Sequence, residues 1–265
     1  MLIAQITDLH LRPKGQLAHN YVDPMANARA TIETVASLSV RPDMIVVSGD
    51  IADEGDANTY AWLDQELERH GIPAYVIPGN HDLRAPMRQA FGHHGYLNRD
   101  GFLHFIVEGG PVRLIALDTV IEHETGGRMC SERCAWLAER LAEDRDTPTV
   151  IMMHHQPFLT GSHFDDIGIE GREVLEEIVS DAPNIARIIC GHMHRDICVG
   201  WANTLVSVCP STAFQFDLQH ADPSVFRVRA EPPAYQLHHW SEETGLVTYT
   251  GTVGEYRLLT ERSSG

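Results

Sequence analysis

The 265-residue sequence is poor in paired cysteines and contains no long apolar run. Its five cysteines are odd in number and form no CxxC pair, which argues against a disulfide framework and against a thiolate zinc site. No stretch approaches the roughly 20 apolar residues that cross a bilayer, and Met1 leads directly into LIAQI without a basic segment. We therefore expect a soluble cytoplasmic protein without a membrane partner.

Basic residues are also scarce. The chain has 20 Lys and Arg against 37 Asp and Glu, which gives a formal net charge of −17. Such a charge repels nucleic-acid backbones, so a nucleic-acid polymer is not an expected partner. A phosphate substrate would need metal ions to neutralise it. The length and the 43% hydrophobic content suit one large α/β domain with room for a small appendage.

Up to residue 196, short apolar runs alternate with amphipathic stretches. The runs are rich in Val, Ile and Leu and have the length of buried strands. They lie at 2–6, 44–47, 74–77, 113–117, 150–153 and 187–190. The stretches carry apolar residues at helical spacing and lie at 25–39, 59–70, 131–144 and 171–182. This alternation predicts an α/β fold with a largely parallel central sheet.

After residue 196 the pattern changes to strand-like segments without helices. These segments read TLVSVCPST, FRVRA, AYQLHHW and GLVTYTGTV. The turn-like sequence SEETG joins the last two, which predicts a hairpin. We expect residues 1–200 to form the core. Residues 201–265 are expected to complete a second sheet and to carry the hairpin as a cap or an oligomer contact.

Polar side chains follow five of the predicted strands at the point where each strand ends. Ligands of open α/β sheets bind at the carboxyl ends of strands, so these side chains would meet at one edge. They are Asp8, His10, Asp50, Asn80, His81, Asp82, His154, His155, His192 and His194. Carboxylate, amide and imidazole donors without thiolates suit Zn, Mn, Fe or Co. A structural role is the simpler interpretation of any single histidine among 16. Candidate ligands follow five strand ends, however, and this repetition favours a metal site.

The blocks DLH, GD, GNHD, HH and GHMH occur in this order between residues 8 and 194. They resemble the five motif blocks of the calcineurin-like metallophosphoesterase superfamily. Within it the chain is most similar to the class III cyclic nucleotide phosphodiesterases and the glycerophosphodiesterases. MLIAQITDLH, PDMIVVSGDI, VIPGNHD and CPSTAFQF carry this closer similarity. The resemblance implies a two-sheet β-sandwich flanked by helices, with residues 1–200 as the catalytic core.

The resemblance also implies a centre of two divalent metal ions that share one carboxylate. The first ion would be held by Asp8, His10, Asp50 and His194, and the second by Asp50, Asn80, His154 and His192. A shared carboxylate holds two ions roughly 3.5–4 Å apart, which suits in-line phosphoryl displacement by a bridging hydroxide. Asp50 and His81 are the expected catalytic residues. His81 would stabilise the phosphoryl oxygens or protonate the leaving alkoxide.

The expected substrate is a small phosphodiester, either a 3′,5′-cyclic nucleotide or a glycerophosphodiester. A phosphomonoesterase using the same site stays open as the alternative. The acidic charge argues against a nuclease, and the complete ligand set argues against a non-enzymatic binding protein. We expect a homo-oligomer.

Several other residues are candidates for smaller roles. Asp82 would orient His81 or cap a helix, and His155 would support the site without binding metal. Arg12 and Lys14 would bind phosphate or remain solvated loop charges. The residues that would shape the pocket are Tyr21, His123 and those of PSTAFQF. His238 and His239 are expected to bind no metal, and Cys130 and Cys134, one helical turn apart, are interpreted as small helix residues.

Overall fold

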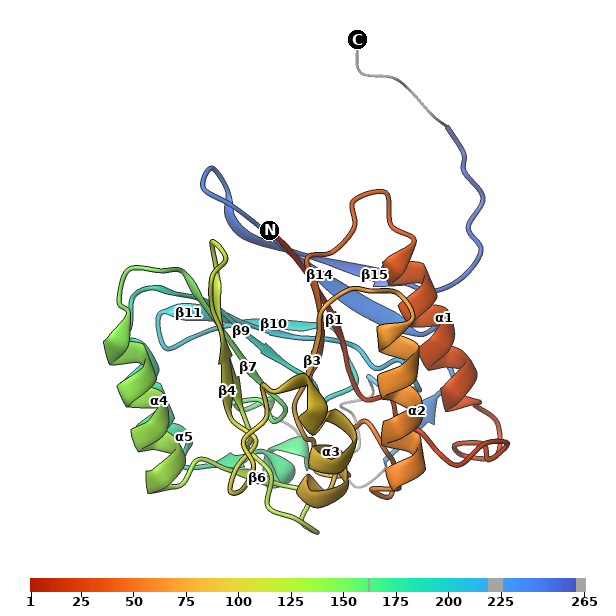
Figure 1. The fold of residues 1–265 in the computed structure, drawn as a ribbon, viewed down its shortest axis with the longest axis horizontal. Coiled ribbons are helices and arrows are strands. Elements are labelled where there is room, and N and C mark those ends of the chain that lie inside the picture. The colour runs from red at the N-terminus through yellow and green to blue at the C-terminus, as the bar shows by residue number, and fades with distance from the viewer. Residues whose placement is uncertain (162, 219–225, 261–265) are drawn as a thin grey trace.

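Two mixed β-sheets lie in the middle of the molecule, with helices on both outer sides (Figure 1). The computed structural model describes residues 1–161, 163–218 and 226–260. The first sheet has the strand order β15-β14-β1-β2-β3 and the second β10-β11-β9-β7-β5-β4. Buried side chains from both sheets belong to one continuous core, so the sheets pack face to face. The prediction of a two-sheet sandwich flanked by helices is confirmed.

The strands of the first sheet are β1 (Leu2–Ile6), β2 (Met44–Val47), β3 (Ala74–Val76), β14 (Ala234–Ser241) and β15 (Gly245–Thr252). Those of the second are β4 (Phe105–Val107), β5 (Arg113–Leu117), β7 (Thr149–Met153), β9 (Ile185–Cys190), β10 (Ile197–Trp201) and β11 (Thr204–Val208). Two short pairs join β6 (Gly127–Arg128) to β8 (Ile169–Glu170), and β12 (Gln215–Phe216) to β13 (Val228–Arg229). The helices are α1 (Pro24–Ala36), α2 (Ala57–Glu68), α3 (Arg84–Phe91), α4 (Ser131–Glu143) and α5 (Arg172–Ser180), with 3₁₀ turns η1 (Gly92–His94) and η2 (His163–Ile167).

The parallel strands are divided between the two sheets. β1, β2 and β3 run parallel in the first sheet, and β5, β7 and β9 run parallel in the second. The prediction of a largely parallel central sheet is therefore wrong in one respect, because the parallel strands belong to two sheets. After α3 the chain forms β4, which pairs antiparallel with β5 instead of continuing beside β3, and a second sheet begins there.

Alternating side chains of β7 show how the layers pack. Val150 and Met152 point into the core shared with the first sheet, whereas Ile151 and Met153 belong to the core under α4 and α5. Because successive residues of a strand face opposite sides, a continuous apolar run is what a strand covered on both faces requires. Packing on both faces therefore fixes the positions of these strands and of the residues that follow them.

Aspartates define where two of the helices begin. The Asp23 side chain accepts a hydrogen bond from the Ala26 amide and precedes Pro24, which is favourable at a first helical position. Asp56 caps α2 in the same way through the Asn58 and Thr59 amides. The start of α2, which lies just after the strand end carrying Asp50, is thus determined locally by sequence.

The C-terminal segments β14 and β15 form the predicted hairpin. They pair antiparallel from Ala234 with Thr252 to Ser241 with Gly245. β14 also pairs antiparallel with β1, so the hairpin extends the first sheet, while β11 pairs parallel with β9 and extends the second. The last part of the chain thereby contributes to both sheets.

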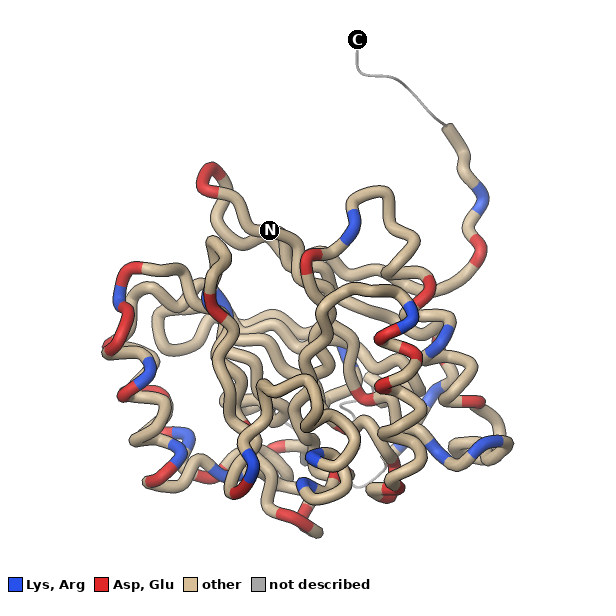
Figure 2. Tube along the Cα trace, in the orientation of Figure 1, with Lys and Arg blue, Asp and Glu red and all other residues tan. Residues whose placement is uncertain are grey.

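Charged residues lie mainly on the helices and outer loops, and the strands carry few of them (Figure 2). Among the helices of the described residues, none is long and apolar enough to span a bilayer.

Candidate metal centre

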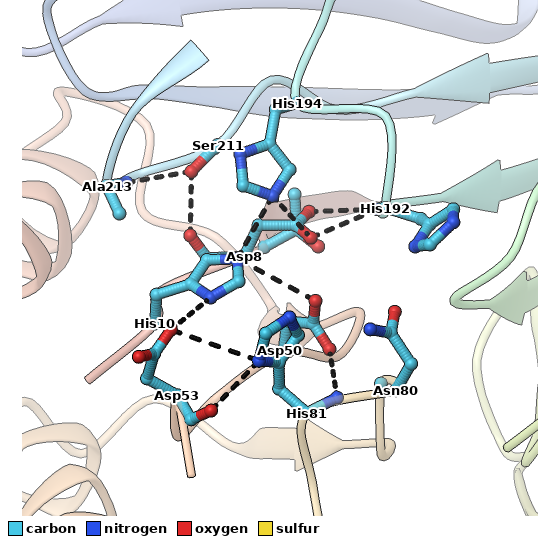
Figure 3. A network of polar contacts seen from close by, with 12 residues as sticks. Asp8, His10, Asp50, Asp53, Asn80, His81, His192, His194, Ser211 and Ala213 are labelled. Atoms are coloured by element: carbon cyan, nitrogen blue, oxygen red, sulfur yellow. Dashed lines mark hydrogen bonds and ion pairs between the residues drawn. The ribbon is translucent and has the colours of Figure 1, made fainter. Parts of the chain in front are cut away.

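The loops at the carboxyl ends of β1, β2, β3, β7 and β9 meet at one edge of the sandwich, where the predicted ligands lie together (Figure 3). Most of them are buried, including Asp8, Asp50, His154, His192 and His194. The structure thus brings the predicted site residues into one cluster.

Backbone carbonyls orient two of the predicted histidine ligands from the second sheet. The Nδ1 of His154 lies 2.8 Å from the carbonyl of Ser48, and the Nε2 of His192 lies 3.0 Å from the carbonyl of Ile167. A carbonyl only accepts hydrogen bonds, so each of these nitrogens carries the hydrogen. The other ring nitrogen of each histidine then presents a lone pair, as in histidines that bind metals.

The two histidines of the other set are held in the same manner. The Nδ1 of His194 donates to the carbonyl of Phe214 at 2.8 Å, and the Nδ1 of His10 donates to Oδ1 of Asp53 at 3.0 Å. Their Nε2 atoms lie 3.0 Å apart. Two lone pairs cannot satisfy each other at this distance, whereas a shared cation would attract both. The donor arrangement therefore fits a metal ion.

The Asp50 carboxylate lies between the two sets of donors. Its Oδ2 is 3.7 Å from Nε2 of His10, and its Oδ1 is 3.4 Å from Nε2 of His154. Asn80 lies on the second side, with its Oδ1 3.1 Å from the same His154 nitrogen. Asp8 lies on the first side, 3.2 Å from Nε2 of His194. One carboxylate thus faces two groups of candidate ligands.

Three groups of candidate ligand residues lie at this edge, and the ligand atoms within each group are within 4.8 Å of one another. The first consists of Asp8, His10, Asp50 and His194, the second of His154, His155 and His192, and the third of His10, Asp53 and His81. His155 is nevertheless occupied by protein partners, because Nδ1 contacts the Thr119 hydroxyl at 2.7 Å and Nε2 the Thr125 carbonyl at 3.1 Å. This agrees with the interpretation of His155 as a supporting residue.

Five of the predicted ligands have a left-handed backbone, which is rare outside glycine. They are Asp8, His10, Asp50, His192 and His194, with φ between 44° and 70°. Glycines give the loops room beside them: a Cβ on Gly79 would overlap the Asp50 carboxylate, and one on Gly191 would overlap Thr7 and crowd Asp8. The loops thus combine strained backbone with close packing, and this arrangement directs the candidate ligand side chains into the cluster.

The cluster is strongly coupled electrostatically. Burial lowers the pKa of His154, but the Asp50 and Asp8 carboxylates and the hydrogen bond to the Ser48 carbonyl together raise it to about 9. Burial raises the pKa of Asp50, yet His154 and the other neighbouring histidines hold it well below its usual range. Burial and the charge of His154 lower the pKa of His192 to about 3. An anionic Asp50 therefore needs a cationic partner here, either a protonated imidazole or a metal ion.

His81 lies beside the cluster and lines the cavity above it. Its Nδ1 is 2.9 Å from the Asp53 carbonyl, so Nδ1 carries the hydrogen and Nε2 is left without a carbonyl partner. Burial lowers its pKa, but Asp50 and Asp53 raise it more, so the net pKa lies above the usual value. A half-exposed imidazole of this kind suits a proton donor or a partner for an anion.

The roles expected of Asp82 are wrong. Its carboxylate is fully buried and accepts hydrogen bonds from the backbone amides of Ile51, Ala52 and Gly79 and from the Tyr60 hydroxyl, at 2.8–3.0 Å. α3 begins after Leu83 without a side-chain cap, and it is the carbonyl of Asp53 that holds the His81 ring. Asp82 instead fastens the Asp50 loop and the Asn80 loop to α2.

Asp53 is a site residue that sequence reasoning missed. Its carboxylate receives the His10 hydrogen bond and pairs with Arg12, while its carbonyl holds His81. The signal was a second acidic position in the loop that follows β2, three residues beyond Asp50. An acid in the same turn as a metal ligand is well placed to orient a ligand from the neighbouring strand.

A cavity of about 420 Å³ opens over the cluster. Besides the candidate ligands it is lined by Arg12, His19, Phe214, Phe216 and Phe226. Phe216 stacks on the His194 ring, with centroids 4.2 Å apart and planes 6° apart, and Phe226 meets Phe216 edge-on at 5.0 Å. One wall of the pocket is therefore aromatic, and part of the expected PSTAFQF segment forms it.

The other expected pocket residues lie elsewhere. Lys14, Tyr21 and His123 are exposed and do not line the cavity, so the pocket roles expected of Tyr21 and His123 are wrong. For Lys14 the exposure agrees with the alternative of a solvated loop charge. His238 is buried against Gln5 and Thr248.

Neither His238 nor His239 belongs to a group of candidate metal ligands among the described residues. Within the same part of the chain, Cys130 and Cys134 are free.

Comparison with known proteins shows the family to which the chain belongs. Residues 1–196 match the family model described as calcineurin-like phosphoesterase. The chain is 31% identical over 258 residues to a protein of Arcobacter nitrofigilis named "Probable glycerophosphodiester phosphodiesterase GpdQ", covering 97% of this chain and 94% of that protein. It is 25% identical over 215 residues to the 3′,5′-cyclic adenosine monophosphate phosphodiesterase CpdA of Escherichia coli K12, covering 81% of this chain and 77% of that protein.

Solved structures share the fold. A dimetal phosphatase from Danio rerio superposes with a TM-score of 0.66 at 13% identity, covering 96% of this chain and 99% of that one. The family match, the full-length relative and the shared architecture lead to one conclusion: the chain belongs to the calcineurin-like phosphoesterase family.

Proposed function

We propose that this protein is a dinuclear metal-dependent phosphodiesterase that hydrolyses small phosphodiesters. The position of Asp50, with one carboxylate oxygen facing His10 and the other facing His154, carries the proposal. A carboxylate shared in this way suits two ions roughly 3.5–4 Å apart. The names of relatives that cover most of the chain, glycerophosphodiester and cyclic nucleotide phosphodiesterases, support a diester substrate.

The proposed ligand sets follow the geometry of the cluster. Asp8, His10, Asp50 and His194 would hold one ion, and Asp50, Asn80, His154 and His192 the other. Mn, Fe, Zn and Co all suit this mixture of oxygen and imidazole donors. When bound, the ions supply Lewis-acid polarisation of the phosphoryl oxygens and activation of water at neutral pH.

The remaining steps fall to the protein's own groups. The Asp53 carbonyl fixes the His81 ring so that Nε2 is free to meet a phosphoryl oxygen or to protonate the leaving alkoxide. Arg12 lines the cavity while paired with Asp53, and it adds positive charge where an anionic substrate enters. The Phe214, Phe216 and Phe226 wall would contact the apolar part of a substrate arm and exclude water from that side.

Beyond the site, we propose that residues 1–200 form the catalytic core and that the C-terminal hairpin is a homo-oligomer contact. β15 is the last strand of its sheet, and an unpaired strand edge is a template for another chain. We also propose that the protein is cytoplasmic.

The test pairs metal analysis with a hydrolysis screen. Purified protein is loaded with Mn, Zn, Fe or Co and assayed on bis(p-nitrophenyl) phosphate, p-nitrophenyl phosphate, 3′,5′-cyclic AMP and glycerophosphoethanolamine. We expect two ions bound at the centre and diester cleavage faster than monoester cleavage. Faster monoester cleavage would instead establish a phosphomonoesterase, and absence of turnover with every metal would refute the catalytic proposal.

A further inference from the structure

A second group of metal-ligating side chains contains none of the residues proposed for the dinuclear centre. Asp64 and Glu68 stand one helical turn apart on α2, and His93 and His94 end the 3₁₀ turn η1. The four ligand atoms that they offer lie within 4.8 Å of one another. Two separate segments of the chain thus place two carboxylates opposite two imidazoles.

The Asp64 carboxylate faces both imidazoles. Its Oδ1 is 2.6 Å from Nε2 of His94, and its Oδ2 is 3.6 Å from Nε2 of His93. Glu68 approaches from the next turn of α2, with Oε1 3.4 Å from the same His93 nitrogen. Asp64 is mostly buried at the base of the group, whereas Glu68 and His93 are about half exposed. The group therefore has a fixed base and an open, solvent-facing side.

The orientation of His93 points to a cation. Its Nδ1 lies 2.9 Å from the carbonyl of Ala90, so that nitrogen carries the hydrogen. A neutral ring then directs the lone pair of Nε2 at the oxygens of Asp64 and Glu68, which also only accept. Acceptors that face one another in this way need a proton or a metal ion between them. The same carbonyl contact orients His154 and His194 in the proposed dinuclear centre.

We propose that Asp64, Glu68, His93 and His94 bind one divalent transition-metal ion, with Zn²⁺ as the best-suited species. Two imidazole nitrogens and two carboxylate oxygens match zinc in type and number. A cavity of about 520 Å³ borders Asp64, Glu68 and His94, which leaves room for a water ligand. The hydrogen bond to the Glu68 carboxylate raises the pKa of His93.

The site would link two elements that support the catalytic loop. One turn before Asp64, the Tyr60 hydroxyl of α2 donates to Asp82 at 2.8 Å and accepts from the Leu83 amide at 3.1 Å. These two residues directly follow His81 and precede α3, which continues into η1. An ion bound between α2 and η1 would therefore link these two elements and restrain the segment that carries Asn80 and His81.

The first experiment counts zinc in the intact protein. Wild type, the double variant His93→Gln/His94→Gln and the control His239→Gln, which removes an exposed histidine from β14, are equilibrated with Zn²⁺ and analysed for bound metal. We expect the double variant to bind one equivalent fewer than wild type and the control to match wild type. Equal zinc content in all three overturns the site.

The second experiment separates this site from the dinuclear centre and from misfolding. Glu68→Gln removes one ligand at a position that is about half exposed. Its zinc titration is expected to show one equivalent weakened at least tenfold, while hydrolysis of bis(p-nitrophenyl) phosphate stays within twofold of wild type. An unchanged titration overturns the proposal even if the double variant fails to fold. Because zinc binding is read directly, the result also stands if the phosphodiesterase proposal fails.

Discussion

Replacing Asp53 tests whether the proposed centre depends on a residue outside the two proposed ligand sets. Its Oδ1 holds the Nδ1 hydrogen of His10 at 3.0 Å, and its other oxygen pairs with Arg12. A hydrogen bond to a charged group contributes about 1.5–3 kcal/mol. Loss of such a partner behind a metal-binding histidine weakens metal affinity about 10- to 100-fold. At about 1.4 kcal/mol per tenfold the two figures agree.

We therefore expect Asp53→Ala to weaken binding of the ion proposed to be held by His10 by about 10- to 100-fold. Asp53→Asn should weaken metal affinity by about tenfold or less, because its amide oxygen still accepts the hydrogen bond from His10 although Arg12 loses its anionic partner. Chelator competition with Mn²⁺ measures the affinity, and diester hydrolysis at saturating metal measures what remains. Glu54→Gln, an exposed neighbour in the same loop, is the matched control. Wild-type affinity and wild-type rate in Asp53→Ala would refute the positioning role.

Three further predictions address the centre and the fold. Asp50→Ala should lose both ions and all turnover, and elemental analysis that still finds two tightly bound ions would contradict a shared carboxylate. His81→Ala should keep its metal content and lose about 10²- to 10⁴-fold in rate. Wild-type rates on substrates with poor leaving groups would exclude an acid role for His81. Burial lowers the pKa of His104 to about 4, so the unfolded state binds the proton first as pH falls below about 6.5. Between pH 6.5 and pH 5 this difference should lower the free energy of unfolding by about 2 kcal/mol. Denaturant unfolding should show a smaller pH dependence in His104→Asn, and an equal dependence would contradict this assignment.

Much of the site could be predicted because strand ends are simple to locate. Buried strands appear as apolar runs, and the polar residues that follow them must lie at one edge of a sheet. Asp8, Asp50 and His154 are of this kind. The φ values above zero at the ligand positions are not visible in the sequence, because they result from how neighbouring loops pack.

The missed features depend on contacts between distant segments. Asp82 sits next to His81 in sequence, yet its carboxylate turns away toward the amides of another loop. Asp53 acts on a histidine 43 positions earlier in the chain. The division of the parallel strands between two sheets depended on β4, whose three residues carry too short a pattern to show their partner.

The proposed ligands are divided between the two sheets. Asp8, His10, Asp50 and Asn80 follow strands of the first sheet, and His154, His192 and His194 follow strands of the second. During synthesis, one proposed ligand set is complete only when residue 192 has left the ribosome, and the other only when residue 194 has. Because each proposed ligand set draws on both sheets, either ion can bind tightly only after the sheets have docked. Metal supply in the cell would act on the final closure of the sandwich and leave the formation of each sheet unaffected.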